Sequence, residues 1–82
     1  MTSAQFLGGF ARALRKARLK RGLTQEAVAE AAGVHPTYVS RVETEAYTPT
    51  ISVAFRLSHA VGRSLWSLVK EAEERAPTTK IK

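Results

Sequence analysis

Apolar residues recur along this chain at intervals of three and four positions, the spacing that places them on one face of an α-helix. The first stripe predicts a helix from residue 6 or 7 to about 21, after a frayed start at 1–5. Its buried residues are Phe10, Ala13, Leu14 and Ala17. Later stripes predict helices over about 51–61 and 65–76, and we expect Phe55 and Leu57 of the first of these to close the core. The pattern predicts an all-α protein.

Between these stripes, residues 25–43 predict two short helices joined by a tight turn. Thr24 is a good N-cap for the first helix, Gly33 can take the left-handed conformation that ends it, and Pro36 suits the first position of the second. The first helix presents an apolar face of Val28, Ala31 and Ala32, and the second presents Val39 and Val42. Ala29 is small at the point where two closely crossing helices would leave no room for a larger side chain. With Gln25 as the first position, alanine is fifth, glycine ninth, and valine tenth, fifteenth and eighteenth. This is the spacing of a helix-turn-helix motif.

The chain from about Leu14 to Val69 resembles the Cro/repressor-type (XRE-like) helix-turn-helix family. The segments that carry the resemblance are LRKARLKRGLTQEAVAEAAGV, YVSRVE, the tripeptide PTI and AVGRSLWSLV. The resemblance implies a compact five-helix bundle, the lambda-repressor-like DNA-binding domain, and a role in sequence-specific transcriptional control. It implies no catalytic residue, cofactor or metal. We assign residues 1–76 to this domain and residues 77–82 to a flexible tail.

Composition agrees with a DNA partner. The 82 residues include 13 Lys and Arg against seven acidic residues, all of them Glu, and the formal net charge is +6. Such a surplus favours an anionic partner, here double-stranded DNA. The absence of cysteine excludes a disulfide framework and a thiolate metal site. No apolar run has the length of a signal peptide or a membrane span, so we expect a cytoplasmic protein. The family resemblance implies a bacterial or phage origin and association with the nucleoid.

The helix at 36–43 is expected to lie in the major groove. If Val39 and Val42 face the core, Thr37, Ser40 and Arg41 lie on the outer face. Arg41 is the main candidate for base readout, since a bidentate arginine to guanine is the commonest specific contact. The predicted base contacts are Arg41, Thr37, Pro36, His35 and Ser40. His35 has two open interpretations, a DNA contact or an N-cap residue.

The expected phosphate contacts lie on both sides of that helix, at Gln25, Thr24, Tyr38, Tyr47 and Thr48. The resemblance implies the role of Gln25, because the family often uses a glutamine there to hold a phosphate. The chain departs from the family at Glu45, where many members have glycine. Glutamate takes the left-handed conformation less cheaply than glycine, so we expect the 36–43 helix to end differently or to run one residue longer.

Two further expectations follow from the resemblance. It implies an ion pair between Arg18 and Glu43 that ties the first helix to the end of the third, and we expect this pair to be structural. Family members also often dimerise through the fifth helix or the loop before it. Trp66 lies off the apolar stripe of that helix, so we predict that it is partly exposed and forms a dimer interface with Leu65 and Val69.

The predicted function is a non-enzymatic transcriptional regulator, similar to small repressors and restriction–modification controller proteins. A homodimer would place two copies of the 36–43 helix about 34 Å apart on a roughly palindromic operator. The alternative, from a different class, is an antitoxin-like module that binds a protein partner and binds DNA only secondarily.

Overall fold

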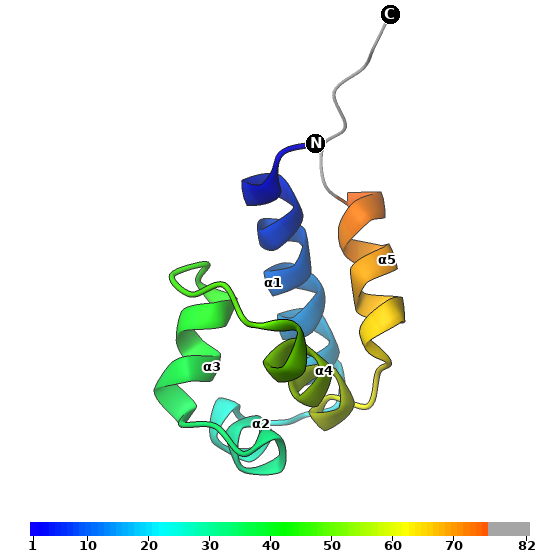
Figure 1. Ribbon diagram of the computed structural model, residues 1–82. Coiled ribbons are helices and arrows are strands. Elements are labelled where there is room, and N and C mark those ends of the chain that lie inside the picture. The colour runs from blue at the N-terminus through cyan, green and yellow to red at the C-terminus, as the bar shows by residue number, and fades with distance from the viewer. Residues whose placement is uncertain (76–82) are drawn as a thin grey trace, which may run out of the picture.

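The computed structural model describes residues 1–75, which form five α-helices and no strands (Figure 1). The helices are α1 (Ser3–Lys20), α2 (Gln25–Ala32), α3 (Pro36–Glu43), α4 (Ile51–Ala60) and α5 (Leu65–Arg75). The predicted all-α, five-helix fold is confirmed. The tail predicted at 77–82 lies outside the described residues.

Helix α1 is the centre of the arrangement (Figure 1). Helix α5 packs along one side of α1 in the opposite direction, and α3 lies on the other side. Helix α2 packs against both α3 and α4. The pair of α2 and α3 therefore contacts the rest of the bundle in two places, α3 against α1 and α2 against α4.

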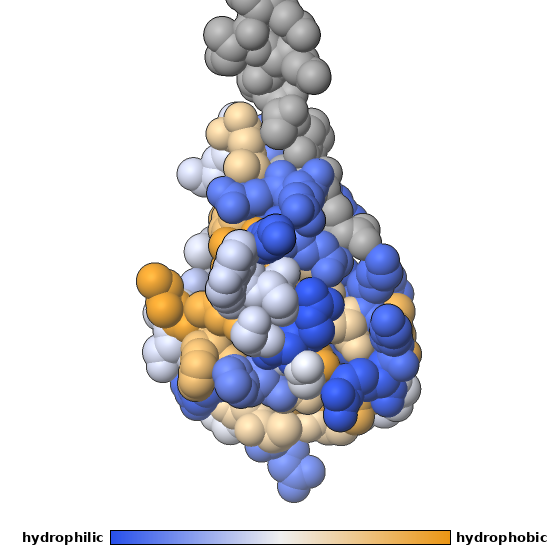
Figure 2. Space-filling view, turned by 90° about the vertical axis from the view of Figure 1, so that its right-hand side faces the viewer, coloured by the Kyte–Doolittle hydropathy of each residue, from blue (hydrophilic) through white to orange (hydrophobic). Residues whose placement is uncertain are grey.

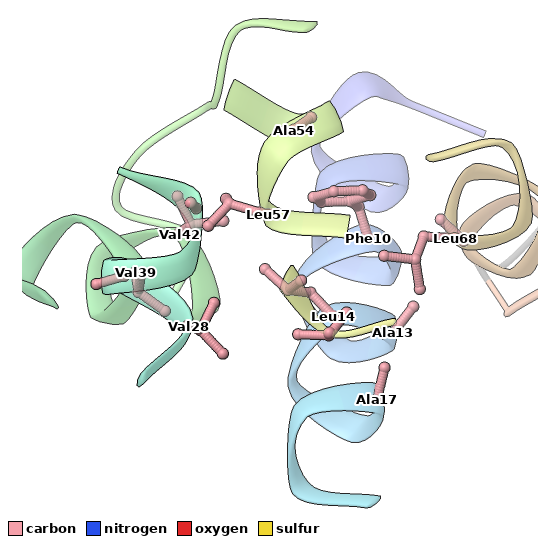
Figure 3. Close-up of a cluster of buried hydrophobic side chains, with 14 residues drawn as sticks. Phe10, Ala13, Leu14, Ala17, Val28, Val39, Val42, Ala54, Leu57 and Leu68 are labelled. Carbon is pink, nitrogen blue, oxygen red and sulfur yellow. The ribbon is translucent and has the colours of Figure 1, made fainter. Parts of the chain in front are cut away.

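One apolar core receives side chains from all five helices (Figure 3). Its large buried side chains are Leu14 from α1, Val28 from α2, Val39 and Val42 from α3, Leu57 from α4 and Leu68 from α5. Burying each of them stabilises the fold by roughly 1.5–3 kcal/mol relative to exposure. The predicted stripe of the first helix and the inward position of Val39 and Val42 are confirmed.

The start of α1 differs from the prediction. The helix begins at Ser3, so the expected frayed start at 1–5 is wrong. The Thr2 hydroxyl accepts from the Gln5 N–H at 3.1 Å, and the Thr2 N–H donates to Gln5 Oε1 at 2.8 Å. This reciprocal capping box satisfies two N–H groups that would otherwise lack partners, and it stabilises a turn that its composition alone does not favour.

Two buried faces also differ from the prediction. On α2, Ala31 is exposed, because the face that meets α3 and α4 is centred on Val28, Ala29 and Ala32; Ala29 is buried as expected for a close helix crossing. On α4, Phe55 is half exposed and does not close the core, whereas Ser58 is fully buried. The Ser58 hydroxyl donates to the Ala54 carbonyl at 2.7 Å, so this polar side chain occupies the core stripe with its hydrogen bond satisfied.

Helices α1 and α5 approach each other closely at Gly9. A Cβ atom at that position would lie 2.7 Å from the carbonyl oxygen of Ala72 on α5. Both residues are buried. Glycine is therefore required at position 9 by the distance between the two backbones, and its presence inside a helix is explained by packing.

Candidate nucleic-acid interface

Helix α3 has one face in the core and one in solvent. Val39 and Val42 are buried, Thr37 and Arg41 are exposed, and Ser40 is half-buried. This division follows from the helical period, which separates residues 39 and 42 from residues 37 and 41. The predicted base-contact residues Thr37 and Arg41 are therefore presented to solvent on a helix that the core fixes in place.

His35 and Pro36 form the beginning of α3. His35 Nδ1 accepts a hydrogen bond from the Thr37 backbone N–H at 3.0 Å, so the histidine is the N-cap. A neutral imidazole that accepts at Nδ1 carries its proton on Nε2, and this second nitrogen is therefore a donor. Capping and a donor contact to DNA are compatible at His35. Pro36 is half-buried in the first turn and has no N–H, so it can offer only apolar contact.

The C-terminal end of α3 is joined to α1 by a buried ion pair. Arg18 Nε donates to Glu43 Oε2 at 2.7 Å, and Arg18 Nη2 donates to Glu43 Oε1 at 3.0 Å. Arg18 Nη1 donates to the Leu23 carbonyl at 2.9 Å. Only 10% of the Arg18 side chain and 2% of the Glu43 side chain are exposed. The structure thus brings together the two residues that were predicted to pair.

The ion pair also affects the titration of Arg18. Hydrogen bonding to Glu43 raises the pKa of Arg18 above its ordinary value, against the opposing effect of burial. A base whose pKa is raised on folding contributes stability fully below its unfolded pKa, and this contribution is lost as the pH rises through the folded pKa. For Arg18 that loss falls in strong alkali, so the arginine remains charged wherever DNA binding is measured.

The beginning of α2 carries two predicted phosphate contacts. Thr24 is the N-cap, and its hydroxyl oxygen accepts from the Ala27 N–H at 3.0 Å while its proton can still be donated. Gln25 is half-buried, and its Nε2 donates to Glu43 Oε1 at 3.1 Å, a contact that the sequence did not predict. The amide carries two N–H bonds, so the second can serve a phosphate while the first holds Gln25 against Glu43.

The loop after α3 corrects one expectation. Helix α3 ends at Glu43, so it does not run one residue longer. Glu45 adopts the left-handed conformation with φ 67°, although it is not glycine. An L-residue in this region costs roughly 1–2 kcal/mol. The turn gives partners to the last carbonyls of the helix, since the Glu45 N–H donates to the Val42 carbonyl at 3.1 Å and the Ala46 N–H to the Arg41 carbonyl at 2.7 Å.

Two tyrosines and Arg41 meet above this loop. The half-buried Tyr38 packs against the core, and its ring centroid lies 5.4 Å from that of Tyr47 with the planes tilted by 52°. The Arg41 Cζ atom lies 5.5 Å from the centroid of the Tyr47 ring. Thr48, the remaining predicted phosphate contact, is exposed in the same loop. Sequence reasoning missed the contacts among these residues, because a helix end and a turn separate Tyr38 from Tyr47.

A second exposed surface, built from α1, α4 and α5, is apolar. It contains a groove of about 280 Å³, lined by Phe6, Leu7, Phe10, Pro49, Ile51, Ala54, Leu65 and Val69. Of the residues that line the groove, Ile51 is 81% exposed; outside its lining, Phe55 on α4 is 50% exposed and Trp66 on α5 is 65% exposed. The face turned to the viewer in Figure 2 has hydrophobic atoms along its left margin and hydrophilic atoms across its centre. Leu65 and Val69 thus line the groove and Trp66 is exposed, whereas Ile51 was not predicted to belong to this surface.

The described part of the chain gives little support for a metal site or a membrane-spanning helix. Within residues 1–75, no three His or Glu side chains gather as a metal site requires. His59, far from His35 in the sequence, packs its ring against Phe55 at a centroid distance of 4.4 Å. No described helix has the length and hydropathy needed to cross a bilayer.

Comparison with known proteins identifies the family of the chain. The helix-turn-helix model HTH_3 matches residues 14–65. The clp gene regulator ClgR from C. glutamicum is similar at a TM-score of 0.82 and 27% identity, over 90% of this chain and 96% of that one. The hypothetical transcription factor NHTF from Neisseria is similar at a TM-score of 0.78 and 28% identity, over 92% and 87%. The restriction-modification controller protein C.AhdI from Aeromonas hydrophila is similar at a TM-score of 0.72 and 29% identity, over 76% and 94%. No curated protein matches the chain.

The matched segment contains all of α2, α3 and α4, together with Arg18 and Glu43. The resemblance noted from the sequence is therefore confirmed, as is the similarity to restriction-modification controller proteins. The chain belongs to the helix-turn-helix family HTH_3, and it is a DNA-binding transcriptional regulator rather than an enzyme.

Proposed function

We propose that this regulator binds a roughly palindromic operator as a homodimer, with one α3 in each of two successive major grooves. The observation that carries the proposal is the division of α3 into a buried face, Val39 and Val42, and an exposed face that includes Thr37 and Arg41. A helix fixed on one side and polar on the other can present the same side chains to DNA in every complex. That constancy is what sequence-specific readout requires.

Arg41 is the proposed base reader. Its exposed guanidinium can donate two hydrogen bonds to guanine O6 and N7, a contact worth roughly 1–3 kcal/mol of discrimination against a wrong base. Thr37 and Ser40 can bond to base edges, and the Thr37 methyl can contact a thymine methyl. His35 can donate from Nε2, and Pro36 can contact the groove wall.

Phosphate contacts would flank α3 on both sides. On one side, the start of α2 offers the Thr24 hydroxyl, the second amide N–H of Gln25 and the positive end of the helix dipole. On the other side, hydroxyl groups come from Tyr38, Tyr47 and Thr48. These contacts would fix the register of α3 in the groove, and the net charge of +6 would add a salt-dependent attraction.

The second copy of the chain is the proposed occupant of the apolar groove. Leu65 and Val69 line the groove with the strongly exposed Ile51, and Trp66 is exposed on the same helix as Leu65 and Val69. Apolar surface gathered in one place marks an interaction site. Aromatic residues are enriched in such interfaces, and a two-fold axis would bring the same patch of both copies together. To enter two successive major grooves, the two α3 helices of this dimer have to lie about 34 Å apart.

The dimer is tested by sedimentation velocity at tens of micromolar protein. Ile51→Ser and Trp66→Ser should each shift the population toward monomer. Leu19→Ser is the matched control. Leu19 has the size of Ile51 and is also exposed, at 51%, but it lies on the basic outer face of α1. A wild-type chain that sediments only as monomer, or a control that dissociates as strongly as Ile51→Ser, would remove this part of the proposal.

The operator is tested by selection from a random duplex library at about 150 mM salt, where phosphate attraction alone is weakened. The wild-type chain should yield a palindromic consensus, and Arg41→Ala should lose information at one position in each half-site. Binding that enriches no sequence and fades as salt rises would contradict sequence-specific readout.

An autoregulating repressor or controller is the biological role we favour, since a restriction-modification controller protein is among the solved neighbours. This role belongs in the cytoplasm of a bacterial or phage-infected cell, at the nucleoid. If no operator emerged while the apolar groove bound a different protein, the antitoxin-like interaction module would replace this assignment.

A further inference from the structure

We infer that Tyr47 is a positioning residue for Arg41, and that the base preference of α3 therefore depends on the loop that follows it. This inference rests on the proposed function, because it takes Arg41 as the base reader. It gives the Tyr47 ring a role beside the phosphate contact proposed for its hydroxyl.

The backbone of the loop is fixed to Arg41 itself. The Ala46 N–H donates to the Arg41 carbonyl at 2.7 Å, and the Tyr47 N–H donates to the same carbonyl at 3.1 Å. The chain can return in this way because Glu45 takes a left-handed conformation. Tyr47 is thus held directly above the residue whose side chain its ring contacts.

Glu45 also connects the loop to α1. A Cβ atom at Gly8 would lie 3.0 Å from Glu45 Oε1, so the glutamate side chain lies against the helix at a position that glycine leaves open. A residue held in an unfavourable backbone conformation persists only where its surroundings determine it. The contact with α1 and the two bonds to the Arg41 carbonyl are such surroundings.

The side chains continue this connection to the guanidinium. Tyr38 is half-buried against the core, Tyr47 packs against Tyr38 at 5.4 Å between centroids, and Arg41 Cζ lies 5.5 Å from the Tyr47 ring. A chain of side-chain contacts thus runs from the core to Arg41. Tyr47 has an exposed fraction of 46%, so it remains accessible to solvent and to DNA.

A ring is a suitable support for a base-reading arginine. The attraction between a cation and an aromatic face uses none of the N–H donors, so the guanidinium keeps its donors for guanine. A carboxylate in the same place would occupy them, as Glu43 does for Arg18. Holding the side chain near its bound conformation also reduces the conformational entropy lost on binding.

The expected effect is modest and confined to one base position. A cation–aromatic contact at an exposed site corresponds to about a 2- to 5-fold change in an equilibrium constant. Tyr47→Leu should lower the preference for the selected base at the Arg41 position by this factor. Tyr47→Phe keeps the ring and removes the hydroxyl, so it should leave that preference unchanged.

The same two variants distinguish the role of the ring from a phosphate contact of the hydroxyl alone. If Tyr47 acted only through its hydroxyl on a phosphate, Phe and Leu would weaken binding equally to every sequence, with no change in base preference. A double-mutant cycle adds a further check, because Tyr47→Leu in an Arg41→Ala background should have no effect on that base. An effect of the same size in both backgrounds would overturn the inference.

A measurement without DNA separates this inference from the proposed function. In NMR spectra of the DNA-free protein, the Arg41 side-chain protons should show ring-current shifts that persist in Tyr47→Phe and disappear in Tyr47→Leu. Their absence in the wild type would overturn the inference even if an operator were found. Shifts that are present in a protein that selects no base would support the contact and count against Arg41 as the reader.

Discussion

Arg18 and Arg41 are two arginines in opposite settings, one behind α3 and one on its surface. The Arg18 guanidinium donates hydrogen bonds to the two carboxylate oxygens of Glu43 and to the Leu23 carbonyl, and its side chain is buried. Arg41 is exposed and lies against the ring of Tyr47. This cation–aromatic contact uses none of its N–H donors. The contrast shows how one side chain serves the fold when its donors are satisfied internally and is available for recognition when they are not.

The strongest test of this contrast removes the buried arginine. Arg18→Ala should lower the free energy of unfolding by about 3–5 kcal/mol, because it leaves the buried Glu43 carboxylate without its cation. Urea denaturation measures the change. Arg15→Ala is the matched control, since Arg15 is exposed on the same helix and its loss should change stability by no more than about 0.5 kcal/mol. Equal midpoints for the two variants would contradict a structural role for the pair.

The complementary test removes the exposed arginine. Arg41→Ala should leave the free energy of unfolding within about 0.5 kcal/mol of wild type, since Arg41 is on the surface. It should cost roughly 1–3 kcal/mol of discrimination at one base position in each half-site. Urea denaturation and a binding titration with matched and substituted duplexes give the two values. A large loss of stability would show that Arg41, like Arg18, serves the fold.

The smallest expected effect sharpens the comparison at the loop that supports Arg41. Glu45→Gly and Glu45→Ala both remove the carboxylate, but only glycine relieves the positive φ, so the glycine variant should be more stable by about 1 kcal/mol. The difference is read from paired urea titrations. Identical stabilities would mean that alanine accommodates this turn without strain.

The sequence predicted what depends on short-range periodicity. Leu14, Val39 and Val42 are buried as the spacing required, and Gly33 takes the left-handed conformation expected at the end of α2. The Arg18–Glu43 contact came from family resemblance, since nothing local relates residues so distant in the chain. In these cases either the helical period or a known motif determines the position.

The remaining errors concern information held in tertiary contacts. Whether Ala31 is buried depends on how α2 is rotated against its neighbours, and the exposure of Phe55 depends on which side of α4 the bundle covers. Glu45 adopts a costly conformation that contacts elsewhere stabilise. The capping box of Thr2 and Gln5 is different, because its residues have the spacing of a known signature and were open to recognition from the sequence.

The hydrogen bonds of the Glu43 carboxylate affect how the helix-turn-helix motif unfolds locally. It accepts hydrogen bonds from Arg18 on α1 and from Gln25 at the start of α2, while its own backbone ends α3. Three helices thus meet at one side chain, and the first and last residues of the motif are joined through it. In amide hydrogen exchange, α2 and α3 should therefore exchange as one cooperative unit with the adjoining end of α1, with a shared opening free energy, instead of α3 fraying from its own C-terminus.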